Sequence, residues 1–168
     1  MFQLKRLSRE GIGPALRKAE RYRLLNEPWE AESICLDVLD VEPDNQEALV
    51  TLILARTDQF GLDHGVGVEE ARSLLPRLAQ EYDRLYYAGL ICERRGRSLL
   101  DRSRTGVGPV AYDWLRQAMD WYERAEAVRP PGNDDAILRW NTCARTIQRH
   151  PHLRPEPAEA EAPALTME

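Results

Sequence analysis

The stretch Asn26–Asn45, NEPWEAESICLDVLDVEPDN, decides the fold, because it joins an apolar helical face to an end marked by proline. Ala31, Cys35 and Val38 follow one another at spacings of four and three residues, so they share one face of a helix. Pro43 ends this helix, because proline restricts the residue before it and lacks a backbone donor. The stretch therefore predicts one half of a helical hairpin.

The spacing of Ala31, Cys35, Val38 and Pro43, which we call the recurrent frame, occurs again late in the chain. Its four positions are repeated at the same offsets by Ala118, Tyr122, Ala125 and Pro130. This recurrence resembles the tetratricopeptide repeat (TPR), whose period is about 34 residues. The resemblance covers roughly residues 13–148 and implies an all-α superhelix, or solenoid, of about three and a half helical hairpins. One hairpin cannot bury both of its apolar faces, which is why such units stack.

The first two hairpins can be placed by their turn residues. We expect the first to span residues 14–43, with Asn26 in the left-handed turn between its helices. The second opens near Asn45, and its second helix runs from about residue 68 to residue 80. Pro76 lies inside that helix and should kink or split it.

The third hairpin carries a second inserted loop. Leu85, Ala88, Gly89 and Cys92 suit its first helix, and Gly96 marks the expected turn. Its second helix is expected over residues 111–129. A last helix over residues 134–149, capped by Asn133, would cover the end of the stack.

The two ends of the chain are assigned to separate segments. Phe2, Leu4 and Leu7 have helical spacing, so residues 1–13 predict a short leading helix that Gly11 and Gly13 end. The TPR-like domain covers residues 14–149. Residues 150–168 are rich in proline, alanine and glutamate and predict a disordered tail.

Composition excludes several classes of protein. In 168 residues, 43% are apolar and 30% charged, which is typical of one soluble globular domain. No apolar run reaches the roughly 20 residues of a membrane span, and the N-terminus lacks the apolar core of a secretory signal. The net charge of −5 argues against nucleic-acid binding. We expect a cytoplasmic protein that contacts neither membrane nor nucleic acid.

The resemblance implies a concave groove lined by the first helix of each hairpin, which would bind a peptide or a partner protein. Register assigns the following residues to this groove: Glu20, Arg23, Val50, Leu54, Thr57, Asp58, Tyr86, Leu90, Glu93, Leu138, Thr142 and Arg145. Family members that clamp the terminal carboxylate of chaperone tails place lysine, asparagine and arginine on this face. The equivalent positions hold Leu16, Glu20, Thr51, Asp83 and Tyr87, so the clamp is absent.

No residue pattern indicates a cofactor, a metal site or catalysis. His64 beside Asp63 could act as a metal ligand or base, but a lone histidine in a glycine-rich loop is more simply a turn residue. His150 and His152 could chelate a metal weakly, or form a solvated cationic helix end. The three cysteines are scattered among apolar residues, which predicts small core residues.

Two surface features have open interpretations. The aromatic set Trp114, Trp121, Tyr122 and Trp140 has the spacing of core residues, although part of it could form a homodimer contact. The second feature is a basic cluster that could meet an acidic partner, meet the acidic tail, or form a solvated loop: Arg94, Arg95, Arg97, Arg102 and Arg104.

The sequence therefore predicts a protein–protein interaction module, an adaptor or scaffold rather than an enzyme. The alternative is an accessory subunit that binds and orients a partner enzyme through the inserted loops at residues 61–67 and 97–110. An enzyme is disfavoured, because no nucleophile–base pair, carboxylate pair or metal-ligand spacing is present.

Overall fold

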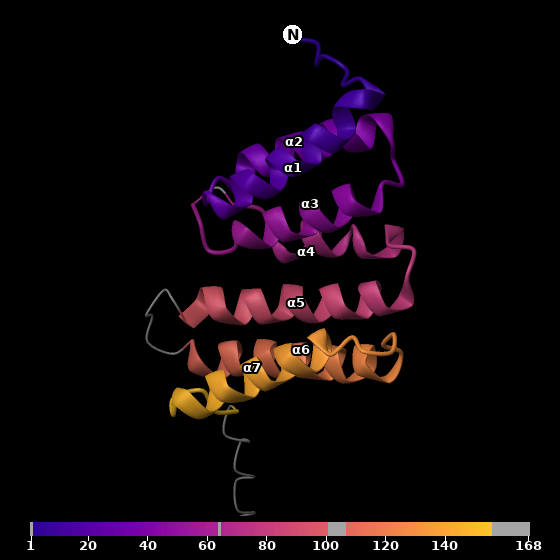
Figure 1. The fold of residues 1–168 in the computed structure, drawn as a ribbon. Coiled ribbons are helices and arrows are strands. Elements are labelled where there is room, and N and C mark those ends of the chain that lie inside the picture. The colour runs from indigo at the N-terminus through magenta and orange to yellow at the C-terminus, as the bar shows by residue number, and fades with distance from the viewer. Residues whose placement is uncertain (1, 64, 101–106, 156–168) are drawn as a thin grey trace, which may run out of the picture.

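The computed structural model describes residues 2–63, 65–100 and 107–155, and all regular structure in these ranges is helical (Figure 1). The first half of the chain forms α1 (Ile12–Leu24), α2 (Pro28–Val41), α3 (Gln46–Asp58) and α4 (Val68–Arg72). The second half forms α5 (Glu81–Leu100), α6 (Gly108–Ala127) and α7 (Asp135–Arg149). Single turns of 3-10 helix lie at Arg9–Gly11 and Leu75–Arg77. The prediction of an all-α chain is confirmed.

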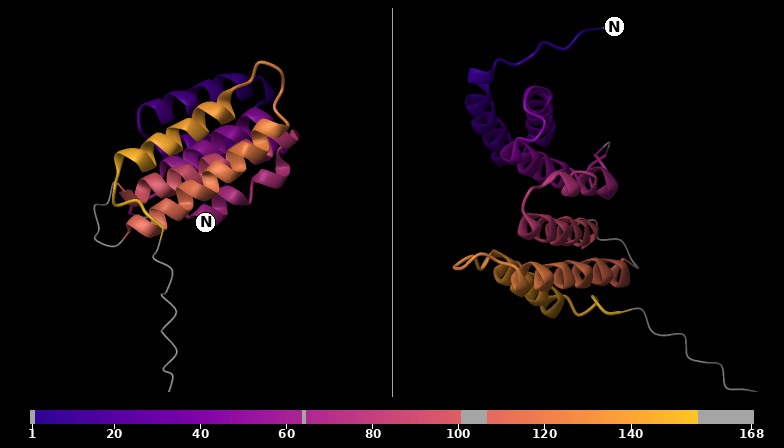
Figure 2. Two further views of the ribbon diagram at one scale, coloured as in Figure 1. Left: turned by 90° about the horizontal axis from the view of Figure 1, so that it is seen from below. Right: turned by 90° about the vertical axis from the view of Figure 1, so that its right-hand side faces the viewer.

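The helices lie in layers that follow the order of the chain, from α1 and α2 at one end to α6 and α7 at the other (Figure 1). Helices adjacent in sequence pack together in the pairs α1–α2, α2–α3, α5–α6 and α6–α7. In addition, α1 contacts α3, α3 contacts α5, and α5 contacts α7. The side view in Figure 2 shows the successive layers stepped relative to one another. We call α1, α3, α5 and α7 the odd-helix row.

The recurrent frame is buried in both helices that carry it. Ala31, Cys35 and Val38 of α2 expose no surface. The equivalent positions of α6 are equally inaccessible: Ala118, Tyr122 and Ala125. One apolar cluster unites α1 to α4 and includes Ile91 of α5, and a second unites α5 to α7. Full burial of a large apolar side chain stabilises a fold by about 1.5–3 kcal/mol, so these faces drive the packing of both hairpins.

Several predicted helix boundaries are confirmed. Asn26 has a φ of 61°, the left-handed conformation expected between α1 and α2. The Asn45 side chain caps α3 by accepting the backbone N–H of the third helical residue at 2.9 Å. The helix expected over residues 68–80 is split into α4 and a 3-10 turn that contains Pro76, because proline lacks the backbone donor that would continue α4. The last helix, α7, begins at Asp135 rather than at residue 134 and has Asp134 as its N-cap, while Asn133 Oδ1 accepts the backbone N–H of Asp135 at 3.0 Å.

The predicted leading helix is wrong. Residues 2–7 have no regular structure. Gly11 ends only a single 3-10 turn, and Gly13 lies inside the first turn of α1. Phe2 and Leu4 are 101% and 92% exposed, so they do not cover the first hairpin. Helical spacing over seven residues is too short to nucleate a helix without tertiary contacts.

The predicted turn at Gly96 is also wrong, because α5 continues to Leu100. Gly96 lies where α5 meets α6, and a Cβ there would lie 3.1 Å from Leu115 Cγ and 3.2 Å from Ala111 O. The glycine serves close helix packing rather than a change of direction. The second helix of this hairpin begins at Gly108 rather than near Ala111.

The packed domain extends beyond α7. Leu153 is 3% exposed and belongs to the core of α5 to α7, and its N–H donates to His150 O at 2.8 Å. A Cβ at Gly108 would lie 2.5 Å from His152 O, so this segment crosses directly over the start of α6. The tail expected to begin at residue 150 thus contributes a core residue. Residues 156–168 lie outside the described part of the chain.

Candidate functional site

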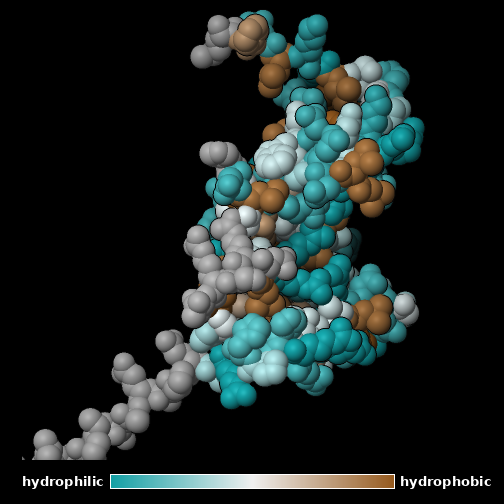
Figure 3. Space-filling model, turned by 90° about the vertical axis from the view of Figure 1, so that its left-hand side faces the viewer, coloured by the Kyte–Doolittle hydropathy of each residue, from teal (hydrophilic) through white to brown (hydrophobic). Residues whose placement is uncertain are grey.

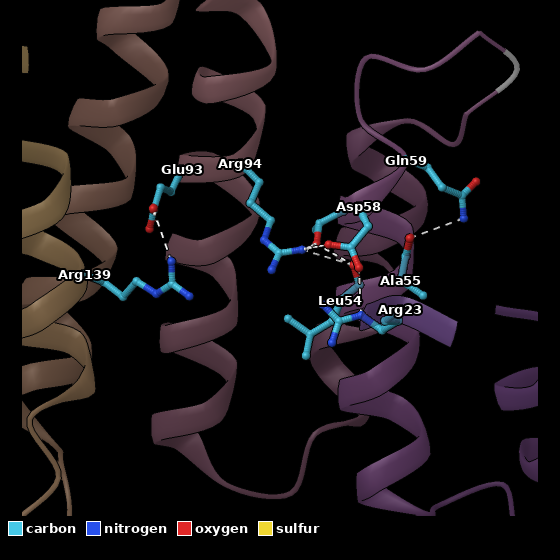
Figure 4. Close-up of polar contacts among 9 residues, drawn as sticks. Arg23, Leu54, Ala55, Asp58, Gln59, Glu93, Arg94 and Arg139 are labelled. Carbon is cyan, nitrogen blue, oxygen red and sulfur yellow. Dashed lines mark hydrogen bonds and ion pairs between the residues drawn. The ribbon is translucent and has the colours of Figure 1, made fainter. Parts of the chain in front are cut away.

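Two clusters of charged side chains lie on the odd-helix row (Figure 4). In the first, the Asp58 cluster, Arg23 Nε of α1 donates to Asp58 Oδ2 of α3 at 2.7 Å. Arg94 of α5 binds the other oxygen of Asp58, and its Nη1 also donates to Thr57 Oγ1 at 2.8 Å. Asp58 therefore links three helices, of which α1 and α5 are its neighbours on either side.

In this cluster, the pKa of the Arg94 guanidinium is lowered from its ordinary value. Burial lowers the pKa of its guanidinium, the carboxylate of Asp58 raises it, and the positive charges of Arg23 and Arg139 lower it again. Arginine nevertheless stays protonated in proteins at physiological pH. The side chains of Arg23, Asp58 and Arg94 are 17%, 23% and 24% exposed, so the cluster is fixed but still reaches solvent.

The second cluster is built around Glu93 of α5, whose side chain is 1% exposed. Tyr122 of α6 donates its hydroxyl to Glu93 Oε2 at 2.7 Å. Arg139 of α7 lies 3.4 Å from Glu93 Oε1, and Arg97 lies 3.6 Å from the same oxygen. A buried carboxylate is costly unless paired, and these contacts satisfy it. We call these four residues the Glu93 cluster.

The Tyr122 hydroxyl acts in this cluster as a donor. Burial, followed by the negative charge of Glu93, raises the pKa of the Tyr122 phenol above its usual value. The ring also packs tightly: a Cβ at Gly89 would lie 2.7 Å from Tyr122 Cε1. The glycine predicted for the first helix of this hairpin therefore makes room for the buried tyrosine of α6.

Together the two clusters carry excess positive charge. Two carboxylates, Asp58 and Glu93, face four guanidinium groups. Arg97 and Arg139 remain 46% and 34% exposed. A surface of this kind favours a partner that brings carboxylates.

The predicted groove residues fall into three groups. Glu20, Leu138 and Arg145 are exposed, and Leu138 exposes 61% of its surface. Six others are half-buried: Arg23, Val50, Leu54, Asp58, Tyr86 and Thr142. Thr57, Leu90 and Glu93 are 3%, 2% and 1% exposed, so none of them offers free surface to a partner.

The structure joins only part of that set. It brings Arg23 and Asp58 together, and Leu54 contributes its carbonyl oxygen to Arg94 at 3.3 Å. Tyr86 stacks on Tyr82 with ring centroids 5.7 Å apart.

The helical register predicted for α7 assigns Leu138 to the groove but not its neighbour Arg139. One residue of error turns a helix by about 100°, which exchanges an inward side chain for an outward one. Arg94 and Arg97 belong to the basic cluster whose interpretation the sequence leaves open, and both lie on α5 rather than in a loop. Arg102 and Arg104 lie outside the described residues.

A second candidate site lies beside the loop that follows α3. A hollow of about 390 Å³ is bounded by this loop, by Arg95 of α5 and by Trp114 of α6. The Trp114 ring also lies under the guanidinium of Arg72, 5.3 Å from its centroid. A Cβ at Gly65 would lie 2.2 Å from Gln59 O, so the loop closes tightly on the end of α3. His64, the predicted turn residue, lies outside the described part of the chain.

The aromatic residues are mostly committed to internal contacts. Tyr122 is fully buried, and its neighbour Trp121 is half-buried with Arg124 over its ring at 4.7 Å. Trp140 Nε1 donates to Glu123 Oε1 at 2.9 Å. The structure thus places Trp121, rather than Tyr122, toward the surface.

All three cysteines are buried, which confirms the prediction of core residues. Burial raises the pKa of Cys35 and of Cys143 to about 12, so both are protonated at neutral pH. Within the described ranges, no three histidine, cysteine, aspartate or glutamate side chains lie close enough together to hold a metal ion. His150 Nδ1 lies 2.8 Å from Thr146 O, at the end of α7.

No family model, curated protein or solved structure matches this chain. No helix in the described residues combines the length and the apolar character of a membrane span. The geometry of the two clusters and of the loop hollow is therefore the basis for assigning a function.

Proposed function

We propose that this chain is a protein–protein interaction module with a TPR-like stack of helical hairpins, which binds a peptide or a partner protein along the odd-helix row. Two observations support the TPR-like arrangement. The recurrent frame is buried in both α2 and α6, and each helix of the odd-helix row contacts the next one. In such a stack, the side formed by the first helices is the extended binding surface.

The observation that carries the proposal is the pair of clusters on this row. Partly exposed guanidinium groups are held in place by Asp58 and Glu93, so they lose little freedom when they bind a second carboxylate. Arginine also offers planar, bidentate recognition of carboxylates. The partner segment should therefore carry aspartate or glutamate.

The test is capture of partners from native lysate by the wild type and by an Arg23→Gln/Arg97→Gln variant. Each carboxylate keeps one arginine in this variant, since Asp58 retains Arg94 and Glu93 retains Arg139. The fold should survive while the excess charge is lost. We expect a partner retained by the wild type to be depleted at least about tenfold.

The matched control is Arg116→Gln/Arg124→Gln on α6, which removes the same charge away from the odd-helix row. Retention of the partner by this control and its loss from the first variant would place binding on the row. A partner held equally by both variants would contradict the proposal.

The loop hollow supports a second candidate, an accessory subunit that docks on a partner enzyme. Leu62 is 43% exposed at the rim of the hollow, beside Arg95 and Trp114. In this case Leu62→Ser should weaken a stoichiometric complex, whereas Val128→Ser, at a residue 42% exposed on another surface, should not. Of the predicted second loop, residues 97–100 belong to α5 and residues 101–106 lie outside the described chain.

A further inference from the structure

Charge is segregated within the first hairpin. Residues 2–26 contain seven basic and two acidic side chains, whereas residues 27–45 contain seven acidic side chains and no basic one. The segment of residues 2–7, which we call the arm, and helix α1 are therefore strongly basic, and α2 is strongly acidic. A surface with both signs in separate zones is complementary to a second copy of itself when the two are related by a twofold axis.

The outer side of this hairpin has two adjoining hollows. The first, of about 510 Å³, lies between α1 and α2, with Tyr22 and Ile34 among its apolar residues and Glu30 among its acidic ones. The second, of about 300 Å³, lies between the arm and α2 and includes Leu36 and Asp40. Leu7 and Asp37 line both, so the two form one trough of apolar and acidic residues, which Lys18 of α1 and the arm's own Leu4, Lys5 and Arg6 also line.

The arm has the complementary chemistry but is poorly covered by its own chain. Phe2 and Leu4 are 101% and 92% exposed, and the basic residues Lys5 and Arg6 follow them directly. Arg6 lies 3.8 Å from Asp40, but both side chains are about 70% exposed, so this contact is weak. Figure 3 shows apolar and hydrophilic residues side by side on this arm at the end of the molecule.

We propose that two copies of this chain pair through the outer side of the first hairpin, each arm lying in the trough of the partner. Phe2 and Leu4 enter the apolar part, and Lys5 and Arg6 meet the carboxylates of α2. The contact of Arg6 with Asp40 within one chain shows that the arm reaches this border, but it leaves the apolar residues in water. A second copy supplies the missing cover. This surface is separate from the two clusters on the odd-helix row.

The first hairpin is a stronger candidate for self-association than the aromatic surface predicted from sequence. Trp140 already donates to Glu123, and Trp114 already lies under Arg72. Six of the ten large apolar residues exposed in the described chain lie at or before Leu36, in the arm and the first hairpin. The uncovered apolar surface is thus concentrated at this end of the molecule.

The experiment measures the oligomeric state of the full chain by sedimentation over a concentration series, with two charge-reversed variants. Lys5→Asp/Arg6→Asp reverses the arm, and Asp37→Lys/Asp40→Lys reverses the trough. We expect a wild-type dimer that weakens with added salt, and at least about tenfold weaker dimerisation of each variant alone. An equimolar mixture of the two variants should dimerise again, because each arm then meets a trough of opposite charge.

Arg145→Asp/Arg149→Asp is the control for a change of charge at the other end of the molecule, and it should dimerise like the wild type. Phe2→Ser/Leu4→Ser removes the apolar contact without altering charge and should leave a folded monomer. A monomeric wild type throughout the series would overturn the proposal. So would a dimer that both reversed variants retain, or a mixture that stays monomeric.

Discussion

The second and third hairpins have similar helical sequence patterns but differ in the length and packing of their helices. In the third, α5 and α6 are each 20 residues long and pack along their length, with Tyr122 against Gly89. In the second, α4 is only five residues long, and a loop and a 3-10 turn complete the hairpin. The difference teaches that close helix contact stabilises the fold, whereas the shortened hairpin leaves room for a loop and its hollow.

The strongest test of this difference is removal of Tyr122, the buried aromatic residue between α5 and α6. Tyr122→Ala should lower the free energy of unfolding by about 3–5 kcal/mol, because it leaves a cavity and takes the hydroxyl donor from Glu93. Urea denaturation followed by circular dichroism measures this loss. Tyr112→Ala, at a half-buried residue of the same helix, should cost clearly less; equal losses would show that the close contact is not special.

A smaller effect is expected from Gly89→Ala. The added methyl group would lie 2.7 Å from the Tyr122 ring, and overpacking of this kind costs about 1–3 kcal/mol. Gly13→Ala in α1 is the matched control, since its methyl group would meet only Arg17 Nη1 at 3.6 Å. Higher helix propensity should stabilise this control by up to about 1 kcal/mol. Thermal melts should therefore move in opposite directions, and a shared direction would contradict the packing argument.

Alkaline pH should weaken the packing of α5 to α7 through buried acids. Burial raises the pKa of Cys143 from 9.0, the value of a free thiol, to about 12, and burial raises that of Tyr87 from 10.0 to about 12. Between these values the native state binds more protons than the unfolded state, so stability falls as pH rises. The loss is about 1 kcal/mol for the thiol at pH 10.

Urea unfolding at pH 8 and at pH 10 measures this slope, and Cys143→Ala should flatten it. The segment from α3 to the 3-10 turn after α4 contains no cysteine or tyrosine. Hydrogen exchange should therefore show the alkaline loss in α2, which carries Cys35, and in α5 to α7 before it appears in α3. Earlier loss in α3 would mean that these acids do not cause it.

The smallest effect on global stability is expected in the second hairpin. Gly65→Ala places a methyl group 2.2 Å from Gln59 O, so the loop must shift away from α3. Because opening is local, the free energy of unfolding should fall by less than about 1 kcal/mol. Limited proteolysis between residues 59 and 67 should accelerate, and unchanged cleavage would show that the loop is not held in this way.

Features that depend only on residues close to one another in the sequence could be predicted from it. The frame of Ala31, Cys35 and Val38, the left-handed Asn26 and the break at Pro76 follow from helical periodicity and backbone sterics alone. Helical spacing in the arm does not predict its structure correctly, because so short a segment forms a helix only if another element packs on it.

The candidate site required tertiary contacts that periodicity does not contain. Glu93 appears as a surface charge in any pattern, but its partners Tyr122 and Arg139 are 29 and 46 residues away. Gly96 alone predicts a turn, and its role in packing becomes visible only through Leu115 of the next helix. In each case the residue type was informative only after the helix opposite was known.

The segment that passes over the start of α6 determines where the chain leaves the domain. Leu153 is held in the core and His152 lies against Gly108, so residue 155 starts from a fixed point. A fluorescent dye or a fused protein attached at residue 155 would therefore have a defined position, from which distances to other parts of the protein could be measured. This anchored segment after α7 lies at the α6 end of the stack, opposite the basic arm (Figure 1).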